Sequence, residues 1–366
     1  MKPVLFVTGH APAYRVGAFQ RLHERETVEF ALFGGRMIHG GAAHERELPF
    51  PHRMVRPREL AAIAASGRFR AVVCPTGGRI APLASWAGAR RAGVPLILWA
   101  SLWAHPRSLA HALSYLALRR LYGSADAVVT YGPHVSAYVR ARGARNVHVA
   151  PQSVDNEFWR SPDVGPPPSG SWPAQASTRF LFVGRAAPEK GLAVLLRAWR
   201  ASGVDPARTA LVVVGGGGAP GGGAPAGAQE GACEGVAFID PLAPPALRDA
   251  YAAGDALVVP SIATRTFREP WGLVVNEAMN RGLPVIASDA VGAAAGGLVQ
   301  DGHNGIIVAA GDEGALADAI RRLALDAPLR RRMGEAAAGD VRAYDHDSWA
   351  AGFSAAFASV GASAGA

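Results

Sequence analysis

The sequence predicts a protein of the α/β class, with two open parallel sheets that belong to two domains. Short apolar runs alternate with longer stretches suited to helices along the whole chain, as in repeated βαβ units. The alternation occurs as two series, and a segment rich in Pro, Gly and Ser separates them. The length of 366 residues is sufficient for two ordinary α/β domains, each with its own core.

The first series of strands begins at the N-terminus. The apolar part of Met1 to Gly9 is too short for a signal peptide and is typical of a first buried strand. Further apolar runs follow, each separated from the next by a stretch suited to a helix. The strands predicted in this half are Val4–Val7, Phe30–Phe33, Ala71–Cys74, Pro95–Trp99 and Ala127–Thr130.

The second series follows a linker at residues 161–178, which contains too much Pro, Gly and Ser for regular structure. We therefore predict a first domain at 1–160 and a second at 179–343. Ligands of such domains bind at the carboxyl ends of strands, so we expect a site in a cleft between the two domains. The strands predicted in the second half are Phe180–Val183, Leu211–Val214, Val236–Ile239, Leu257–Pro260, Val285–Ser288 and Ile306–Val308.

The composition excludes several classes of protein. No uninterrupted apolar stretch approaches the roughly 20 residues that a membrane-spanning helix needs, so we expect a cytoplasmic protein. The cysteines, Cys74 and Cys233, lie far apart and lack the spacing of metal ligands, which argues against a disulfide or a zinc site. No cluster of His, Asp and Glu has metal-ligand spacing either, so we expect neither a metal nor another cofactor.

Positive charge is concentrated in the first half of the chain. Residues 1–160 contain 21 basic and 9 acidic residues, whereas residues 161–366 contain 16 and 20. This polarity favours an anionic partner, such as a phospholipid surface, a lipid diphosphate or an anionic sugar. The alternative is that arginine simply occupies solvated faces. A nucleic acid is not expected, because the sequence has no recognition motif and no aromatic platform.

Two carboxylates frame the most informative segment, Glu269 to Glu277, which reads Glu-Pro-Trp-Gly-Leu-Val-Val-Asn-Glu. An apolar strand precedes it, and residues 273–281 are suited to a helix that stops at Gly282. Glu269 is therefore expected in a loop at the carboxyl end of a strand, and Glu277 on the helix that follows. Gly272 would let backbone amides approach an anionic ligand closely. The alternative is a helix start that merely carries acidic residues.

A second turn combines Arg185 and Lys190 between a predicted strand and a helix. Lys190 is one of two lysines in the chain, the other being Lys2. A guanidinium beside a compact ammonium suits a diphosphate, although a solvated pair at a helix start is the alternative. The run from Gly215 to Gly223 opens no clear amphipathic helix, so we interpret Gly215 and Gly216 as a close turn and the rest as a flexible loop.

These motifs, in this order and spacing, resemble the family 4 retaining glycosyltransferases, the glycosyl transferases of group 1, which have the GT-B fold. The resemblance is strong over residues 150–366 and weaker over residues 1–125. It implies two Rossmann-like domains that face each other across a cleft, and a C-terminal helix, residues 344–366, that crosses back to the first domain. The matching segments are Val149–Asp155, Val183–Arg185, Pro188–Gly191, Glu269–Glu277, Gly282–Asp289 and Asp301–Gly305.

The resemblance also implies a role for each donor-site residue. Arg185 and Lys190 would bind the diphosphate of a nucleotide-sugar, and Gly184, in the same turn, would also belong to the donor site. Glu269 would hold the hydroxyls of the transferred sugar, and Glu277 would accept hydrogen bonds from the ribose. Further contacts would come from the backbone at Gly272, Leu273 and Val274, and from Ile239 beside the base.

The activity that the resemblance implies is hexosyl transfer with retained configuration, without a metal, to a saccharide or a lipid-linked acceptor in cell-surface glycan biosynthesis, including polysaccharide biosynthesis. Catalysis would rest on positioning and on electrostatic stabilisation of the leaving group, so no protein nucleophile is needed. A non-catalytic nucleotide-sugar-binding subunit is an alternative. A sugar-nucleotide epimerase is a weaker one, because residues 1–125 contain no Asp that would serve as an acid or base.

The acceptor side is expected in the first domain. The resemblance makes His105, which follows a predicted strand, a candidate catalytic residue near the transferred sugar, and the alternative is a partly buried loop histidine. His10, Tyr14 and Arg15 replace the glycine pair that the family commonly carries after its first strand, which indicates an unusual acceptor pocket. Residues 107–120 form a basic amphipathic segment, on which Leu109, Leu113 and Leu116 share a face. That face would lie on the inner face of the plasma membrane, as a peripheral contact, or pack on the sheet.

Overall fold

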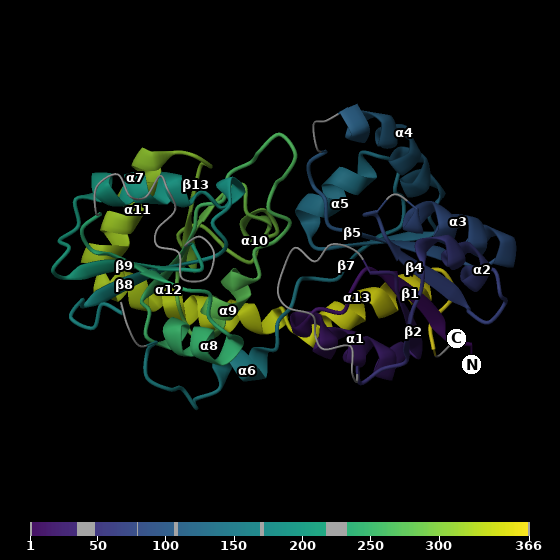
Figure 1. Cartoon of the computed structure of the whole chain (residues 1–366), viewed down its shortest axis with the longest axis horizontal. Coiled ribbons are helices and arrows are strands. Elements are labelled where there is room, and N and C mark those ends of the chain that lie inside the picture. Colours follow the sequence, from purple (N-terminus) through teal and green to yellow (C-terminus); the bar gives the residue numbers. More distant parts are fainter. Residues whose placement is uncertain are drawn as a thin grey trace. The chain divides into compact units, whose positions relative to one another are not determined.

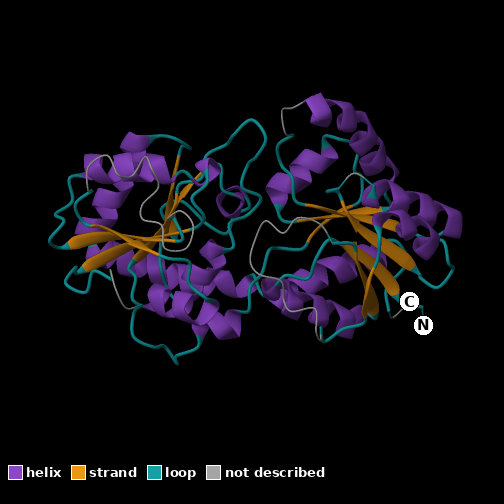
Figure 2. Cartoon of the chain, in the orientation of Figure 1, coloured by secondary structure: helices purple, strands orange, loops and turns teal. Residues whose placement is uncertain are grey.

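A computed structural model shows two compact units, formed by residues 1–155 with 344–366 and by residues 156–343. Each unit contains one parallel sheet with helices on both faces (Figures 1 and 2). Backbone and side chains are described for residues 2–34, 48–78, 80–105, 115–168, 172–216 and 233–364, and the backbone alone for 109–114.

The first unit contains a seven-stranded sheet with the strand order β3-β2-β1-β4-β5-β6-β7, in which every neighbouring pair is parallel. All five strands expected in this half are present, within two residues at each end. Two edge strands, β3 and β7, were not expected. The bounds are β1 (Val4–Thr8), β2 (Val28–Leu32), β3 (His52–Met54), β4 (Ala71–Pro75), β5 (Leu96–Ala100), β6 (Ala127–Thr130) and β7 (Val147–Val149).

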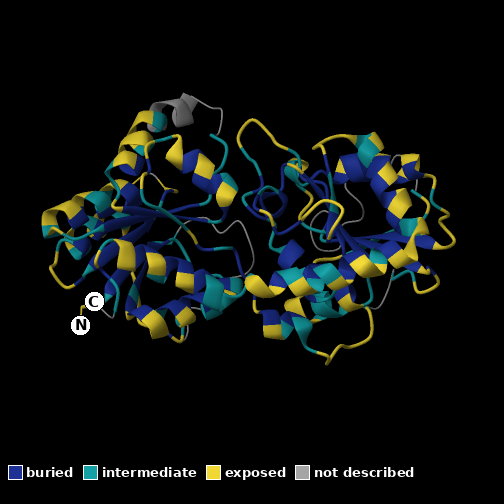
Figure 3. Cartoon of the chain, turned by 180° about the vertical axis from the view of Figure 1, so that it is seen from behind, coloured by how far each residue is buried: buried dark blue, intermediate teal, exposed yellow. Residues whose placement is uncertain are grey.

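Side chains of β1 alternate between two apolar layers, as the pleat of a strand requires. Val4 and Phe6 face the layer that contains side chains of α1 and α13, and Leu5 and Val7 face the layer on the other side. The sheet is thus buried on both faces, and the exposed residues lie on the outer sides of the helices (Figure 3). The helices of this unit are α1 (Ala13–Glu26), α2 (Leu60–Ala64), α3 (Ala81–Ala92), α4 (Leu109–Ser124), α5 (Pro133–Arg140) and α13 (His346–Ser359), with a 3-10 turn at Pro57–Glu59.

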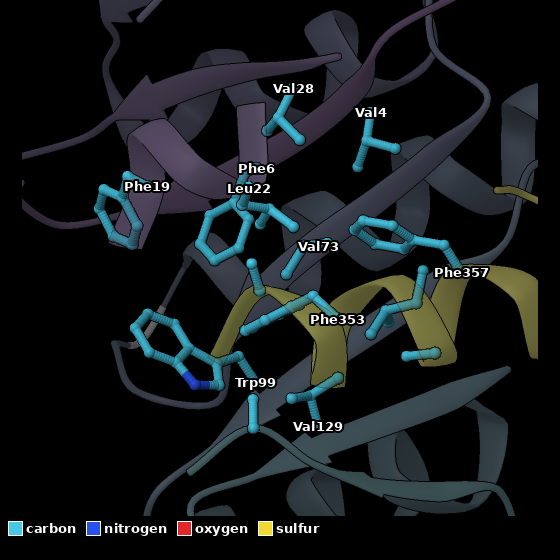
Figure 4. Close-up of a cluster of buried hydrophobic side chains, with 14 of the residues drawn as sticks. Val4, Phe6, Phe19, Leu22, Val28, Val73, Trp99, Val129, Phe353 and Phe357 are labelled. Atoms are coloured by element: carbon cyan, nitrogen blue, oxygen red, sulfur yellow. The ribbon is translucent and has the colours of Figure 1, made fainter. Parts of the chain in front are cut away.

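The last helix, α13, returns to the first unit and completes its core, beside α1. Figure 4 shows Phe6, Trp99 and Phe353 gathered along this helix. The ring centroids of Phe6 and Phe353 are 5.3 Å apart, and those of Trp99 and Phe353 are 6.0 Å apart. Such tilted or edge-on pairs are the favoured aromatic geometries. The C-terminal segment is therefore a structural part of the N-terminal unit.

Phe353→Ala is accordingly expected to destabilise the protein by about 3–5 kcal/mol, because it removes a fully buried ring and leaves a cavity. The change is measured as the shift of the urea unfolding midpoint. Leu325→Ala is the control, since Leu325 is 79% exposed and its loss should alter stability by about 0.5 kcal/mol or less. Equal effects of the two substitutions would contradict the packing of α13 on the sheet.

The second unit contains a six-stranded sheet with the order β10-β9-β8-β11-β12-β13, again with parallel neighbours throughout. All six strands expected in this half are present. Residues 161–168 and 172–177 contain no helix or strand, and β8 begins at Thr178. The strands are β8 (Thr178–Val183), β9 (Thr209–Val214), β10 (Val236–Ile239), β11 (Ala256–Val259), β12 (Val285–Ser288) and β13 (Gly305–Val308).

Helices cover both faces of this sheet as well. Side chains of α7 and α11 share one apolar layer with residues of the central strands, and α9 contacts β11 and β12. The helices are α6 (Asn156–Arg160), α7 (Leu192–Ser202), α8 (Pro244–Ala252), α9 (Val274–Asn280), α10 (Gly292–Ala295), α11 (Glu313–Leu325) and α12 (Ala327–Asp340), with 3-10 turns at Pro188–Lys190 and Val341–Ala343.

The strand order places a switch point between β8 and β11. From β8 the chain continues to β9 on one side, whereas β11 pairs with β8 on the other side. The loops that leave the carboxyl ends of β8 and β11 therefore start side by side and diverge. In open α/β sheets this position is the usual ligand-binding crevice. The Arg185/Lys190 turn follows β8, and the Glu269 loop follows β11.

Candidate functional site

The turn after β8 lies directly against the end of β11. Gly191 has a left-handed φ of 71°, and a Cβ atom added there would lie 1.9 Å from the carbonyl oxygen of Pro260. The amide of Ile262 donates a hydrogen bond of 3.0 Å to the carbonyl of Glu189. Only glycine combines this backbone conformation with such a close approach. The result is that Lys190 is held at the switch point.

The loop after β11 is held in a similar way by the start of α10. The amide of Gly292 donates to the carbonyl of Glu269 at 3.1 Å, and the amide of Ala293 donates to Trp271 at 2.8 Å. A Cβ atom on Gly292 would lie 1.9 Å from the carbonyl oxygen of Pro270. Gly272 turns the chain with a φ of 92°. These contacts explain why Glu269, on an irregular loop, is only 5% exposed.

The two loops meet in an ion pair. The Nζ atom of Lys190 lies 2.5 Å from Oε2 of Glu269, and the side chains are 18% and 7% exposed. From the sequence, Lys190 and Glu269 are expected to bind different parts of one ligand, and their direct contact was not predicted. A largely buried pair of this kind depends on both partners, because either charge alone would be poorly solvated. It also leaves ammonium N–H groups of Lys190 for a ligand, since an ammonium has three.

Arg185 is the more accessible cation of the turn. Its side chain is 49% exposed, and one nitrogen lies 3.3 Å from Oε1 of Glu189. An exposed ion pair of this type contributes little to stability, so the guanidinium is able to exchange Glu189 for an anionic ligand at small cost. The neighbouring Gly184 donates its amide to Val214 at 3.0 Å, which continues the sheet pairing to the start of the turn.

Glu277 lies on α9, beyond the loop that carries Glu269. The hydroxyl of Tyr251, on α8, donates a 2.9 Å hydrogen bond to Oε2 of Glu277 (α8 and α9 in Figure 1). Glu277 is partly exposed. Burial raises the pKa of Glu277 from its ordinary value to about 7, and the hydrogen bond from Tyr251 acts in the opposite direction. Sequence analysis did not single out Tyr251, because its distance from Glu277 depends on the packing of two helices.

The raised pKa of Glu277 predicts how the ligand-free protein responds to pH. Between pH 4.5 and about 7 the folded state binds a proton that the unfolded state has lost, so this group's contribution to stability falls as the pH rises. Glu277→Gln removes the dependence and should stabilise the protein at pH 8, by up to about 3 kcal/mol, but not at pH 4.5. Urea unfolding at both pH values measures the difference. Glu335→Gln, at an exposed position, is the control and should change neither value.

The other expected donor-site residues line the same sheet edge. Gly272, Leu273 and Val274 form the turn into α9, which has seven residues. Ile239 ends the edge strand β10, and its carbonyl accepts a hydrogen bond of 2.9 Å from the amide of Gly215, which has the left-handed φ of a close turn. Residues 217–223 of the glycine-rich run lie outside the described residues.

The expected acceptor-side residues lie in the first unit. His10, Tyr14 and Arg15 follow β1, and Arg15 is buried, with its guanidinium 4.7 Å from the centre of the Trp99 ring. The same guanidinium donates hydrogen bonds to the hydroxyl of Tyr131 at 3.1 Å and to Oε1 of Gln152 at 2.5 Å. Arg15 thus makes its contacts inside the first unit, and its role on the acceptor side stays a prediction.

His105, in the loop after β5, makes contacts that sequence analysis did not predict. Its Nδ1 atom lies 3.2 Å from the hydroxyl of Tyr138, and its ring contacts Tyr115 edge-on at 5.1 Å. The helix α4 that follows packs on the sheet through Leu121 and Tyr122. Leu116 does not join this contact and is 72% exposed.

Three further observations bear on the expectations from composition. Cys74 and Cys233 are both free, and burial raises the pKa of the Cys74 thiol to about 12. Among the residues described, no group of three His, Cys, Asp or Glu side chains has the arrangement of a metal site. Within that same part of the chain, no helix has the length and apolar character needed to span a bilayer.

Comparison with known proteins identifies the family of the second unit. Residues 177–326 match the family described as Glycosyl transferases group 1. A D-inositol 3-phosphate glycosyltransferase of Corynebacterium glutamicum is 37% identical over 179 residues, which are 46% of this chain and 40% of that protein. The corresponding protein of Actinosynnema mirum is 31% identical over 286 residues, 72% of this chain and 66% of its own length. The chain spans 35–40% of the first four curated relatives it matches.

Solved structures resemble the whole chain. HepE from Anabaena, in complex with UDP and glucose, has a TM-score of 0.70 at 18% identity, and the match covers 98% of this chain and all of that one. Sucrose-phosphate synthase from Thermosynechococcus elongatus has a TM-score of 0.73 at 19% identity, with 98% of each chain covered. At such low identity these matches establish the fold, which confirms the expected pair of parallel-sheet domains. The family match shows that the second unit belongs to the glycosyl transferases of group 1, and the two parallel-sheet domains have the GT-B fold.

Proposed function

We propose that the protein is a glycosyltransferase that takes its sugar from a nucleotide-diphosphate-sugar and retains the anomeric configuration. The observation that carries the proposal is the Lys190–Glu269 ion pair at the switch point of the second sheet, with Arg185 on the same turn as Lys190. It brings cations for a diphosphate and a carboxylate for sugar hydroxyls to one place. Family membership and the resemblance to structures that contain UDP support this assignment.

In this proposal each donor-site residue binds one part of the donor. Arg185 and Lys190 bind the diphosphate, to which a guanidinium offers paired N–H groups and an ammonium a point charge. Glu269 accepts hydrogen bonds from hydroxyls of the transferred sugar while it remains paired with Lys190. Glu277 accepts hydrogen bonds from the ribose, and Ile239 lies beside the base. The two cations take the place of a metal at the leaving group.

The transfer step needs no protein nucleophile in this mechanism. The bond between the anomeric carbon and the phosphate oxygen breaks, and an acceptor hydroxyl forms a new bond to that carbon on the same face. The proton of the acceptor hydroxyl passes to the departing phosphate oxygen, so the nucleoside diphosphate leaves as the second product. Arg185 and Lys190 stabilise the charge that develops on that oxygen. By the precedent of oxyanion holes, one preorganised donor of this kind contributes about 3–4 kcal/mol.

The acceptor proposed first is a phosphorylated polyol, with a glycan and a lipid-linked sugar as the other candidates. The names of the relatives suggest the phosphorylated polyol, because they are D-inositol 3-phosphate glycosyltransferases. The net charge of +12 on residues 1–160 favours an anionic acceptor of any of these kinds. A lipid-linked acceptor would add contact with an anionic membrane, which sedimentation with phosphatidylglycerol vesicles tests.

A panel of nucleotide-sugars tests the donor assignment. The matching donor, at about 100 times its dissociation constant, should add about 2.7 kcal/mol to the stability of the folded state and raise Tm by several degrees. Release of nucleoside diphosphate, with an anomer of unchanged configuration when acceptor is added, supports a retaining transferase. Binding without turnover would instead indicate a binding subunit, and conversion of one nucleotide-sugar into another an epimerase. Turnover that EDTA abolishes would contradict the metal-free mechanism.

A further inference from the structure

We infer that Tyr251 is a positioning residue for nucleotide binding, which aims Glu277 at the ribose hydroxyls and favours the ionised form of its carboxyl group. The inference rests on the proposed function, in which Glu277 binds the ribose. It adds a residue that does not touch the ligand and acts only through this carboxylate.

The geometry allows Tyr251 no other role in binding. Its side chain is fully buried, so its hydroxyl does not face a ligand, and that hydroxyl donates a hydrogen bond of 2.9 Å to Oε2 of Glu277. Glu277 is partly exposed, so the residue is accessible to a ligand, and Tyr251 occupies only its Oε2 atom. A hydrogen bond to one oxygen restricts the rotation of the carboxylate, and a restricted carboxylate is preorganised to accept from a pair of vicinal hydroxyls.

The ring of Tyr251 is held in place by packing against a neighbouring aromatic ring. The ring of Trp159, on α6, contacts the ring of Tyr251 edge-on at 5.7 Å, and α8 and α9 are neighbours. Phenylalanine would satisfy this apolar packing equally well, since the ring needs no hydroxyl for it. The hydroxyl is therefore present for Glu277, because a buried hydroxyl without a partner would cost stability.

The direction of the hydrogen bond follows from the electrostatics of the pair. Burial and the nearby carboxylate raise the pKa of Tyr251 well above its ordinary value, so the phenol keeps its proton and donates. Its donation lowers the pKa of Glu277, which burial has raised to about 7. Without the hydroxyl, the pKa of Glu277 would rise further, and the carboxyl would be largely protonated near neutral pH. A protonated carboxyl is a poorer acceptor for ribose hydroxyls.

The first arm of the test uses the ligand-free protein. In protein labelled with ¹³C at glutamate carboxyls, the Glu277 signal is assigned by its loss in Glu277→Gln and is titrated in wild type and Tyr251→Phe. We expect a midpoint near 7 in wild type and a higher one in Tyr251→Phe. An unshifted midpoint would overturn the inference, whether or not a nucleotide binds. Tyr122→Phe is the matched control, since Tyr122 is equally buried but lies in the first unit, and it should leave the midpoint unchanged.

The second arm compares a ribonucleoside diphosphate with its 2′,3′-dideoxy analogue, using the base that the donor panel selects. Wild type should prefer the ribonucleotide at least tenfold at pH 7, and Tyr251→Phe should lose most of this preference and regain part of it at pH 9. A merely structural role would weaken both ligands equally and leave the ratio unchanged, which would overturn the inference. If wild type binds no nucleoside diphosphate, the proposed function fails and the ribose role fails with it, while the titration still decides the link to Glu277.

Discussion

Lys190→Ala is expected to lower donor turnover by about 10²- to 10³-fold, because it removes a cation placed where negative charge develops on the leaving group. It should also destabilise the second unit by about 3–5 kcal/mol, since Glu269 would lose the ammonium that lies 2.5 Å from its Oε2 atom in a largely buried position. Release of nucleoside diphosphate measures the first effect, and urea unfolding measures the second. Both should be recorded on the same protein, because partial unfolding alone would lower turnover.

Two variants separate catalysis from stability. In Lys190→Ala/Glu269→Gln the carboxylate charge is removed together with the ammonium, so much of the stability should return while turnover stays low. Arg185→Ala removes the exposed cation of the same turn, and should lower turnover while changing stability by about 1 kcal/mol or less. Wild-type turnover by Lys190→Ala would exclude its role at the diphosphate. Unchanged stability would exclude the buried ion pair.

The pattern of apolar runs was sufficient to predict the central strands of both sheets. Runs such as Val4–Val7 and Leu211–Val214 are buried on both faces, so they are almost continuously apolar and easy to recognise. The strands β3 and β7 were missed, because each has three residues at a sheet edge and contains polar side chains: His52 and Arg53 in β3, and His148 in β7. An edge strand pairs on one side and needs less apolar surface, so its sequence carries little signal.

Local motifs located the candidate site but not the contacts within it. Arg185, Lys190, Glu269 and Glu277 were found because each follows a recognisable strand or begins a helix. The 2.5 Å contact between Lys190 and Glu269 joins residues 79 positions apart, and it exists only because β11 pairs with β8 rather than with β10. Strand order does not follow from the apolar pattern. Tyr251 was missed for the same kind of reason, since the packing of α8 beside α9 brings it to Glu277.

Gly191→Ala is expected to destabilise the protein by more than about 4 kcal/mol, and it has a matched control at the other end of the same helix. Gly191 precedes α7 and Gly203 follows it, and both have left-handed backbone, with φ of 71° and 63°. An alanine at either position carries the strain of that conformation, about 1–2 kcal/mol. At Gly203 nothing lies within 4 Å of the added Cβ, whereas at Gly191 it would meet the Pro260 carbonyl oxygen at 1.9 Å.

The difference between the two variants therefore isolates the close approach of the β8 turn to the end of β11. Gly203→Ala should lose about 1–2 kcal/mol in urea unfolding and keep the nucleotide-sugar affinity of the wild type. Gly191→Ala can fold only if the turn withdraws from Pro260, and withdrawal would draw the neighbouring Lys190 away from Glu269. The folded fraction of Gly191→Ala should therefore bind donor at least tenfold more weakly. Similar losses of stability and donor affinity in both variants would mean that the turn does not lie against Pro260. The position of Lys190 beside Glu269 would then not depend on that contact.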